Sequence, residues 1–411
     1  MTEFVAGQED SWRSDPYLGV HVANPEFRDN PYPFLARLRT YAPVHETPEG
    51  VFRLTRYDDV IRMLKEVPSA VRMRDGTVWG SLPELTGGPG QFVLRLDPPD
   101  HTRIRKLMNQ AFRPRAVERL RHRVRALVAE LLDTAMERGE MDIIADLALP
   151  VPSTVICEMM GVPTDDRPMF TQWTALATHL LASAMLTPEQ LEQSIRAVQE
   201  LVAYFDSLIA NRRKHLGEDI LSDLIRAEEE GDRLSEPELM AQSIGLLIAG
   251  FETTIGLIGN GLRAFAEHPE QWWLLRQRPE LVPNAVEECL RYDGPIVATM
   301  RVTREPTRFG DVVIPDDRPV MCFLAAANRD PEHFPEPDRF DITREDIDHL
   351  AFGGGVHFCL GAHLARMETQ EAFAGMVERF AEIEPKSQQL VWGRSLFRVL
   401  GEYPVQLRRA S

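Results

Sequence analysis

Residues 352–361 read FGGGVHFCLG and place one cysteine, Cys359, at the end of a glycine-rich loop. The following run, AHLARMETQEAFAGMVERF (362–380), has a helix-like pattern. Glycines let backbone amides approach a sulfur, and the N-terminal end of the next helix favours negative charge, so this loop favours a thiolate. A thiolate could be a nucleophile or a metal ligand, whereas a buried structural cysteine would leave the glycines and His357 unexplained. Because a nucleophile also needs a base in a polar cleft, the loop favours metal ligation by Cys359.

Length and composition limit the classes of protein to which the chain can belong. It has 411 residues, 44% hydrophobic and 27% charged, which is enough to bury a large core. A formal net charge of -17 argues against nucleic-acid binding, because neutralising phosphates requires a basic face. Neither a disulfide framework nor a zinc site is expected, since no CxxC pair occurs among the four cysteines Cys157, Cys289, Cys322 and Cys359.

No sequence feature divides the chain into separate domains. The lack of a repeat period or a long low-complexity linker predicts one domain over residues 1–411, which begins with an irregular lead-in over residues 1–29. The first residues, MTEFVAGQEDSWRSD, are acidic where a signal peptide would be basic and then apolar. No stretch has the roughly 18 consecutive apolar residues of a membrane helix. We therefore expect a cytoplasmic protein without a membrane anchor.

The hydrophobic pattern predicts a mainly α-helical fold with a minor β part. Between Asp100 and Asp293 apolar residues recur at helical spacing, and helix starts are marked at Thr187-Pro188-Glu189 and Ser235-Glu236-Pro237. Strand-like segments lie near the N-terminus and in the last third of the chain. They are VFRLTRY (51–57), ATMRVT (298–303), PVMCFLA (319–325) and LFRVLGEYPVQL (396–407).

The segment ELMAQSIGLLIAGFETTIGLIGNGLRAFAEHP (238–269) predicts one helix of about eight turns, apolar on nearly every face and therefore in the core. Within it, AGFETT (249–254) puts an acid and two hydroxyls where leucine or alanine would be preferred. Gly250 would let another molecule approach the backbone, and a threonine hydroxyl can bond the carbonyl one turn earlier and loosen the helix. A core helix with a close-packed glycine and locally satisfied threonines explains the same residues equally well.

Two further pairs of polar residues are spaced to share a helix face. Glu288 and Arg291, in EECLRY, can form an ion pair at i and i+3. His101 and Arg105, at i and i+4, either clamp an anion or face water. The ExxR spacing alone decides little, because such pairs are mostly solvated and it recurs at Glu118/Arg121, Glu230/Arg233, Glu305/Arg308 and Glu336/Arg339.

The loop FGGGVHFCLG resembles the haem-binding loop of the cytochrome P-450 superfamily at every fixed position of that pattern. The resemblance extends from about Asn30 to Leu407 and is closest to soluble bacterial members that oxidise natural products, including macrolide hydroxylases. It implies the fold of that family, a triangular, α-rich single domain with small β-sheets. It also implies that Cys359 is the proximal thiolate ligand of haem iron.

The same resemblance assigns roles to other residues. AGFETT looks like the oxygen-binding groove of the central helix, with Glu252 and Thr253 as the catalytic acid and alcohol. Glu288 and Arg291 match a buried structural pair that Arg339, in PDRF, would complete. The residues expected to contact haem, with the arginines and histidines facing its propionates, are His101, Arg105, Ala249, Gly250, Arg301, Phe352, Gly353, His357 and Gly361.

The reaction implied is insertion of one oxygen atom from O2 into a small molecule, by hydroxylation or epoxidation, on a haem b cofactor. No segment looks like a flavin or iron–sulfur domain, so electrons from NAD(P)H would arrive through a separate ferredoxin and ferredoxin reductase. A basic run would steer an acidic ferredoxin to the thiolate side, or is simply a solvated helix face. It consists of Arg103, Arg105, Lys106, Arg113, Arg115, Arg119, Arg121, Arg123 and Arg125.

A largely apolar natural product is the substrate class that best fits the expected pocket. Each residue of the pocket could equally be plain core. The candidate wall residues are Val78, Trp79, Leu82, Leu85, Phe92, Val93, Leu181, Leu247, Ile248, Ile296, Val297 and Phe397.

Other functions of a haem-thiolate protein remain as alternatives. They are a peroxygenase, a nitric-oxide reductase, a phenol-coupling oxidase and a non-enzymatic haem sensor. The pair Glu252 and Thr253 argues against the first two, because an oxygen-activating cycle is what needs that pair.

Overall fold

The computed structural model describes residues 15–21, 24–79, 91–109, 112–180, 186–229, 234–393 and 397–410. Most of these residues are helical, as the hydrophobic pattern predicts. The helices are α1 (Pro25–Asp29), α2 (Tyr32–Tyr41), α3 (Tyr57–Lys65), α5 (Asp100–Met108), α6 (Pro114–Arg138), α7 (Pro150–Met159), α8 (Arg167–Thr178), α9 (Pro188–Arg212), α10 (Ile220–Glu229), α11 (Glu236–Gly250), α12 (Glu252–Glu267), α13 (Pro269–Gln277), α14 (Val282–Asp293), α15 (Leu324–Ala327) and α16 (Ala362–Arg379).

The strands are short and gather into small sheets. They are β1 (Val44–Glu46), β2 (Phe52–Leu54), β3 (Ser69–Ala70), β4 (Glu140–Asp142), β5 (Thr299–Thr303), β6 (Thr307–Phe309), β7 (Val312–Ile314), β8 (Pro319–Cys322), β9 (Phe380–Pro385), β10 (Val391–Trp392), β11 (Leu400–Glu402) and β12 (Pro404–Arg409). The largest sheet in the described chain has five strands in the order β1-β2-β8-β5-β3, and β4-β12-β9 form a second sheet.

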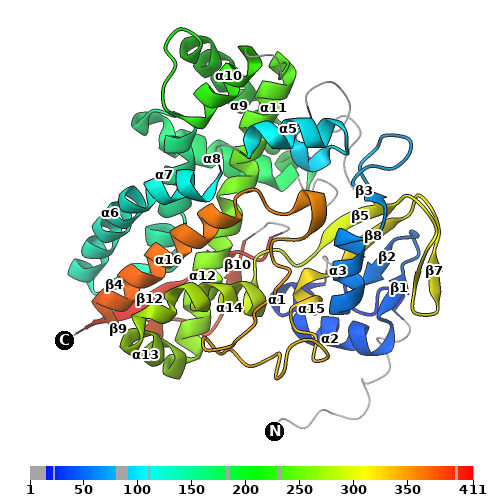
Figure 1. The fold of residues 1–411 in the computed structure, drawn as a ribbon. Coiled ribbons are helices and arrows are strands. Elements are labelled where there is room, and N and C mark those ends of the chain that lie inside the picture. The colour runs from blue at the N-terminus through cyan, green and yellow to red at the C-terminus, as the bar shows by residue number, and fades with distance from the viewer. Residues whose placement is uncertain are drawn as a thin grey trace.

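The largest sheet and the long helices occupy different parts of the molecule, while β4, β9 and β12 lie among the helices α6, α12 and α13 (Figure 1). The five-stranded sheet lies on one side with α2, α3 and α15, while the long helices gather on the other. Helix α12 runs through the middle of the helical part and packs against α14 and α16. The helix after the cysteine loop, α16, therefore contacts the central helix directly.

Helix starts follow the local sequence. Thr187 and Ser235 each form a reciprocal capping box, with Gln190 and Glu238 respectively, at the starts of α9 and α11. Both starts were predicted. The N-terminal stretch predicted to be irregular contains α1, whose backbone amide at Glu26 is capped by Asn24.

The predicted eight-turn helix is interrupted. It consists of α11 and α12, which meet at Phe251 with φ −119° and ψ −39°. The hydroxyl of Thr253 donates to the carbonyl oxygen of Ala249 at 3.2 Å, the backbonding that was expected to loosen the helix. By length and composition the Glu236–Glu267 stretch could cross a membrane, but 61% of its most apolar window is buried inside the protein, as in a core helix.

Candidate active site

The glycines of the 352–361 loop are required by its backbone. Gly353 and Gly355 adopt φ values of 69° and 65°, in the left-handed region that disfavours side chains. A Cβ atom at Gly355 would lie 2.1 Å from the carbonyl oxygen of Leu64 on α3, so no side chain fits there. The amide of Cys359 donates to the carbonyl oxygen of Phe352 at 3.0 Å and closes the loop. The loop thus holds the sulfur next to the start of α16.

The surroundings of the Cys359 sulfur act in opposite directions. Burial raises its pKa, while a hydrogen bond from the Gly361 amide and the charges of Arg105 and Arg366 lower it. Without a metal, burial wins, and the loop alone does not favour the thiolate as the sequence suggested. A bound metal ion removes the thiol proton outright.

Arg366 is held beside this loop by a pair of residues that sequence reasoning missed. Its guanidinium donates twice to Glu287, at 2.7 Å each, and lies 4.5 Å from the centre of the Phe352 ring. His349 Nδ1 accepts from the Ala351 amide, so its Nε2 donates to Glu287 at 3.0 Å. Burial alone would raise the pKa of Glu287, but these hydrogen bonds lower it to about 2. The network fixes a positive charge close to the sulfur.

Four cationic or imidazole side chains gather on the other side of the loop: His101, Arg105, Arg301 and His357. The rings of His101 and His357 lie 4.3 Å apart, and the charges of Arg105 and Arg301 lower the pKa of both. Burial, the largest cause, and these charges bring the pKa of His357 to about 3. The resemblance implies that these four residues lie together, and they do.

No carboxylate of the described residues is hydrogen-bonded to this cluster. Both ring nitrogens of His101 and Nδ1 of His357 are buried without a hydrogen-bond partner there. The guanidiniums of Arg105 and Arg301 donate to Asn109, Thr299 and the carbonyl oxygens of Phe358 and Met300, but to no carboxylate. Asp97 attracts His101 and Arg301, but its oxygens accept from the amides of Val71 and Arg72.

These observations fit a haem. Two propionates would supply the anions that His101, Arg105, Arg301 and His357 lack. No group of three or more His, Cys, Asp or Glu side chains that could hold a metal ion occurs in the described ranges. A metal at Cys359 would therefore have to arrive in a group that brings its other ligands, as a porphyrin does.

The break between α11 and α12 lies at the residues predicted to face oxygen. Ala249, Gly250, Glu252 and Thr253 are partly exposed, whereas most residues from Gln242 to Phe265 are buried. For Gly250 the structure supports the alternative explanation, close packing, because a Cβ atom there would lie 3.3 Å from Ile156 Cδ1 on α7. Close packing against α7 therefore accounts for a glycine at position 250.

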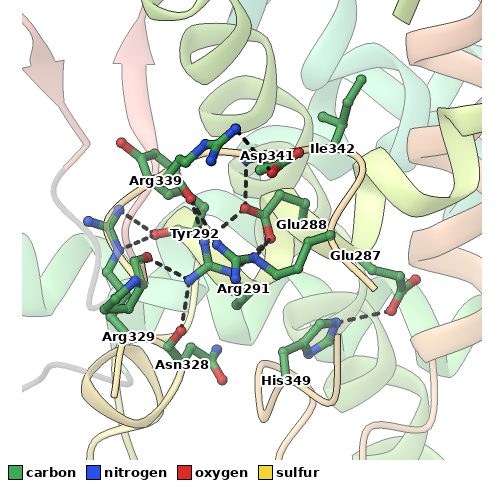
Figure 2. Close-up of polar contacts among 12 residues, drawn as sticks. Glu287, Glu288, Arg291, Tyr292, Asn328, Arg329, Arg339, Asp341, Ile342 and His349 are labelled. Atoms are coloured by element: carbon green, nitrogen blue, oxygen red, sulfur yellow. Dashed lines mark hydrogen bonds and ion pairs between the residues drawn. The ribbon is translucent and has the colours of Figure 1, made fainter. Parts of the chain in front are cut away.

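Glu288 and Arg291 form a buried pair, as the resemblance implies (Figure 2). Their side chains are 0% exposed, and two hydrogen bonds of 2.7 and 2.8 Å join them. The contribution of Arg339 differs from the prediction. Arg339 accepts a hydrogen bond from Arg291 through its carbonyl oxygen, while its guanidinium, 57% exposed, pairs with Glu336 and Asp341. The side chain that approaches Glu288 instead is Arg344, at 3.4 Å.

The predicted pocket residues fall into three groups. Leu82, Leu85 and Leu181 lie outside the described residues. Val93 and Leu247 are 2% and 0% exposed and belong to the core, which contradicts their place in a pocket wall. The partly or more exposed candidates, which remain available to a ligand, are Val78, Trp79, Phe92, Ile248, Ile296, Val297 and Phe397.

A buried glutamine that sequence reasoning missed holds part of this wall. Gln242, 0% exposed on α11, accepts from the amide of Val93 at 3.0 Å and donates to the carbonyl oxygen of Gln91 at 2.9 Å. Phe92 packs so closely on α11 that a Cβ atom at Gly245 would lie 2.1 Å from its ring. The sequence did offer a signal for this role, because Gln242 places an amide side chain in the middle of an apolar helix.

The chain belongs to the cytochrome P450 family. The sequence model of that family, described as "Cytochrome P450", matches residues 44–277 and 272–393. Cytochrome P450 monooxygenase PikC of Streptomyces venezuelae is 40% identical over 98% of this chain and 97% of its own. The 6-deoxyerythronolide B hydroxylase of Saccharopolyspora erythraea is 38% identical over 90% of this chain and 95% of its own.

Solved structures agree with this assignment. The crystal structure of P450BioI, in complex with acyl carrier protein ligated to hexadec-9Z-enoic acid, has a TM-score of 0.85 and 36% identity. The alignment covers 93% of this chain and 100% of that one. The protein is therefore a haem b-dependent monooxygenase that uses O2 and electrons from NAD(P)H passed on by redox partners.

Proposed function

We propose that this enzyme hydroxylates or epoxidises a largely apolar natural-product-type molecule, with Cys359 as the ligand of haem iron. The 6-deoxyerythronolide B hydroxylase, named for oxidation of a natural product, supports this substrate class. When bound, haem supplies the oxidising chemistry, in which one oxygen atom enters the substrate and the other leaves as water. The chain supplies binding, orientation and protons.

The observation that carries this proposal is the cluster of two arginines and two neutral histidines beside the cysteine loop, to which no carboxylate of the described residues is hydrogen-bonded. Burying the charge of Arg301 without a carboxylate partner, and the ring nitrogens of His101 and His357 without hydrogen-bond partners, is costly, and a dianionic ligand at this place would remove that cost. His101, Arg105, Arg301 and His357 would hold the propionates, and Cys359 would hold the iron. Substrate would then meet Thr253 and the partly exposed apolar residues around it.

Thr253 and Glu252 are proposed to handle protons. The Thr253 hydroxyl donates to the carbonyl oxygen of Ala249, and its own oxygen remains able to accept. A hydroxyl in the first turn of α12 can orient a proton donor, such as water, toward the reacting oxygen. The adjacent carboxyl group of Glu252 can then return a proton to that donor. The pair thus keeps water-derived protons on a defined path.

Electrons are proposed to arrive from a ferredoxin and its reductase at the surface of the cysteine loop. Val356 and Phe358 are 60% and 42% exposed there. Much of the basic run is already paired within the protein, because Arg103, Arg121, Arg123 and Arg125 bind Glu238, Glu118, Glu158 and Glu371. Arg113, Arg115 and Arg119 are exposed and form no ion pair with any described residue, so they are the best sites to attract an acidic partner.

A screen for substrate-induced spin-state change tests the substrate class. The purified cytoplasmic enzyme would be titrated with apolar natural products and with carrier-bound acyl chains, the latter because P450BioI was crystallised with such a partner. Compounds that displace water from the iron would then be incubated with NADPH and a surrogate ferredoxin and reductase. Oxygenated product from an apolar natural product supports the proposal. Turnover that requires added peroxide would favour the peroxygenase, and coupled phenols as products would favour the phenol-coupling oxidase. Binding without any turnover would favour the sensor.

A further inference from the structure

A second cluster of buried charges surrounds Asp293 at the end of α14. Asp293 is 2% exposed, and its carboxylate accepts three hydrogen bonds of 2.6 Å, from Arg263, Arg398 and the hydroxyl of Tyr32. Arg263 also pairs with Glu267 at 2.5 Å, so that the charges in the cluster balance. Burial alone would raise the pKa of Asp293, but the two arginines lower it well below its usual range. None of these residues has a role in the chemistry proposed above.

Arg398 is the member that carries the cluster into the segment between β10 and β11. Its guanidinium lies 3.8 Å from the centre of the Trp392 ring and donates to the carbonyl oxygens of Arg28 and Asp29. Its backbone amide donates to the carbonyl oxygen of Pro295 at 2.8 Å. Both the side chain and the backbone of Arg398 are therefore held in place. Because Phe397 is its neighbour in the chain, these contacts also restrict the position of the Phe397 backbone.

Asn260 on α12 joins the same two segments from the other side. Its side-chain amide donates to the carbonyl oxygen of Arg398 at 2.8 Å and to that of Asp293 at 3.2 Å. One amide group thus holds the end of α14 and the 397–399 segment at a fixed separation from the central helix.

The two segments meet α12 close to the proposed catalytic threonine. A Cβ atom at Gly256 would lie 2.8 Å from Pro295 Cβ, 3.0 Å from Val399 Cγ2 and 3.1 Å from the carbonyl oxygen of Arg398. Gly256 follows Thr253 by three residues, about one helical turn. Ile296 and Phe397, next to Pro295 and Arg398, are both partly exposed and were both predicted to face substrate.

We propose that the Asp293 cluster is a positioning device that sets two walls of the substrate pocket, at Ile296 and Phe397, relative to Thr253. Arg398 and Asp293 then determine substrate selectivity without touching substrate. The inference rests on the proposed function, because the pocket itself is part of that proposal. Apolar residues of the same volume would be about as stable, but hydrogen bonds in fixed directions define where the chain must lie.

The test compares a large and a small azole, both of which bind haem iron, by optical titration of the haem-loaded protein. Imidazole reaches the iron without touching the walls, whereas the bulky, apolar clotrimazole must contact them. Arg398→Lys keeps the charge but loses the flat guanidinium on Trp392 and the paired carbonyl contacts. We expect clotrimazole affinity to fall about tenfold and imidazole affinity to change less than about twofold.

Two more variants keep the inference testable if Arg398→Lys folds poorly. Tyr32→Phe removes one hydrogen bond to Asp293 and should weaken clotrimazole about two- to threefold with imidazole unchanged. Phe397→Ala should weaken clotrimazole, and Arg398→Lys added to it should then have little further effect, because Arg398 acts through that wall. Val405→Ala, buried in β12, is the matched control that lowers stability without changing either affinity.

The results that would overturn the inference are distinct. Unchanged clotrimazole binding in Arg398→Lys and Tyr32→Phe, equal weakening of both azoles, or full additivity with Phe397→Ala would each show that the cluster only supports the fold. A wild-type protein without any imidazole shift would instead refute the proposed haem site, and with it the pocket on which the inference rests.

Discussion

Two groups of polar side chains in this protein differ in whether their hydrogen-bond partners lie within the protein. Glu288 and Arg291 satisfy each other, and Arg291 also donates to the carbonyl oxygens of Asn328, Pro337 and Arg339 (Figure 2). In the second group, His101, Arg105, Arg301 and His357, no side chain is hydrogen-bonded to a carboxylate of the described residues, and three ring nitrogens of the two histidines are buried without a hydrogen-bond partner there. The chain's own fold explains the first group, whereas the second is explained only by a ligand. A buried charge whose partners all lie within the protein thus stabilises the fold, whereas a buried group without such partners indicates the site of a ligand.

Removing Arg291 should have the largest effect. Arg291→Ala leaves the Glu288 carboxylate buried and without its main partner, at a cost of about 3–5 kcal/mol, a large part of the stability of a typical protein. We expect little folded protein, with or without added haem, as measured by circular dichroism and urea denaturation.

Arg339→Ala is the control for that variant. Its guanidinium is 57% exposed and does not touch Glu288, so stability should change by less than about 0.5 kcal/mol. If the two variants were equally unstable, the resemblance would be right about Arg339 and our description of the pair incomplete.

A variant of Thr253 tests whether a hydroxyl that already forms a hydrogen bond within its helix can also act in catalysis. In Thr253→Ala, product per NADPH consumed should fall by about 10²-fold or more while hydrogen peroxide rises, because no positioned hydroxyl directs the proton. Glu252→Gln should slow turnover with less peroxide release. Product and peroxide are measured together in wild type and both variants. Unchanged coupling in Thr253→Ala would mean that its hydroxyl only satisfies Ala249.

Removing Arg301 should weaken haem retention without harming the empty protein. Arg301→Gln loses a charge-assisted bond to a propionate, so haem should transfer to excess apomyoglobin roughly 10- to 100-fold faster. The haem-free variant should be at least as stable as the haem-free wild type, because an unpaired buried charge has been removed. Arg308→Gln, at an exposed position of β6, is the control. A less stable haem-free variant with normal haem retention would place Arg301 among the structural charges.

The smallest effect is expected at the protein surface. Arg113→Glu should slow reduction by ferredoxin several-fold at low salt and hardly at all at high salt, as screening removes the steering. Stopped-flow reduction measures both conditions, and Arg318→Glu, exposed beside the five-stranded sheet, controls for the change of net charge. Equal slowing at all salt concentrations would argue against docking near Arg113.

Local signals in the sequence predicted much of this structure. The capping boxes at Thr187 and Ser235 depend on residues close together in the chain, and both were found as expected. The glycines of the loop are required by its backbone, but the loop alone does not favour the thiolate that the sequence suggested. The break at Phe251 was missed as a boundary, although the bond from Thr253 to Ala249, which can loosen a helix, was anticipated.

Contacts between distant segments were harder to predict. The Asp293 cluster joins residues from 32 to 398 in the chain, and no spacing rule connects them. The same reason explains why Arg344, not Arg339, reaches Glu288, and why Val93 and Leu247 prove to be core. The sequence pattern of an apolar residue is the same whether its side chain contacts a ligand or a neighbouring helix.

The central claim, that Cys359 is the thiolate ligand of haem iron, is tested most directly by the carbon monoxide spectrum of the reduced protein. Wild type should show the red-shifted band of thiolate ligation. Cys359→His should, if it retains haem, show a histidine-type band and form no oxygenated product. A thiolate-type band that persists in Cys359→His, or its absence from freshly purified wild type, would contradict the account.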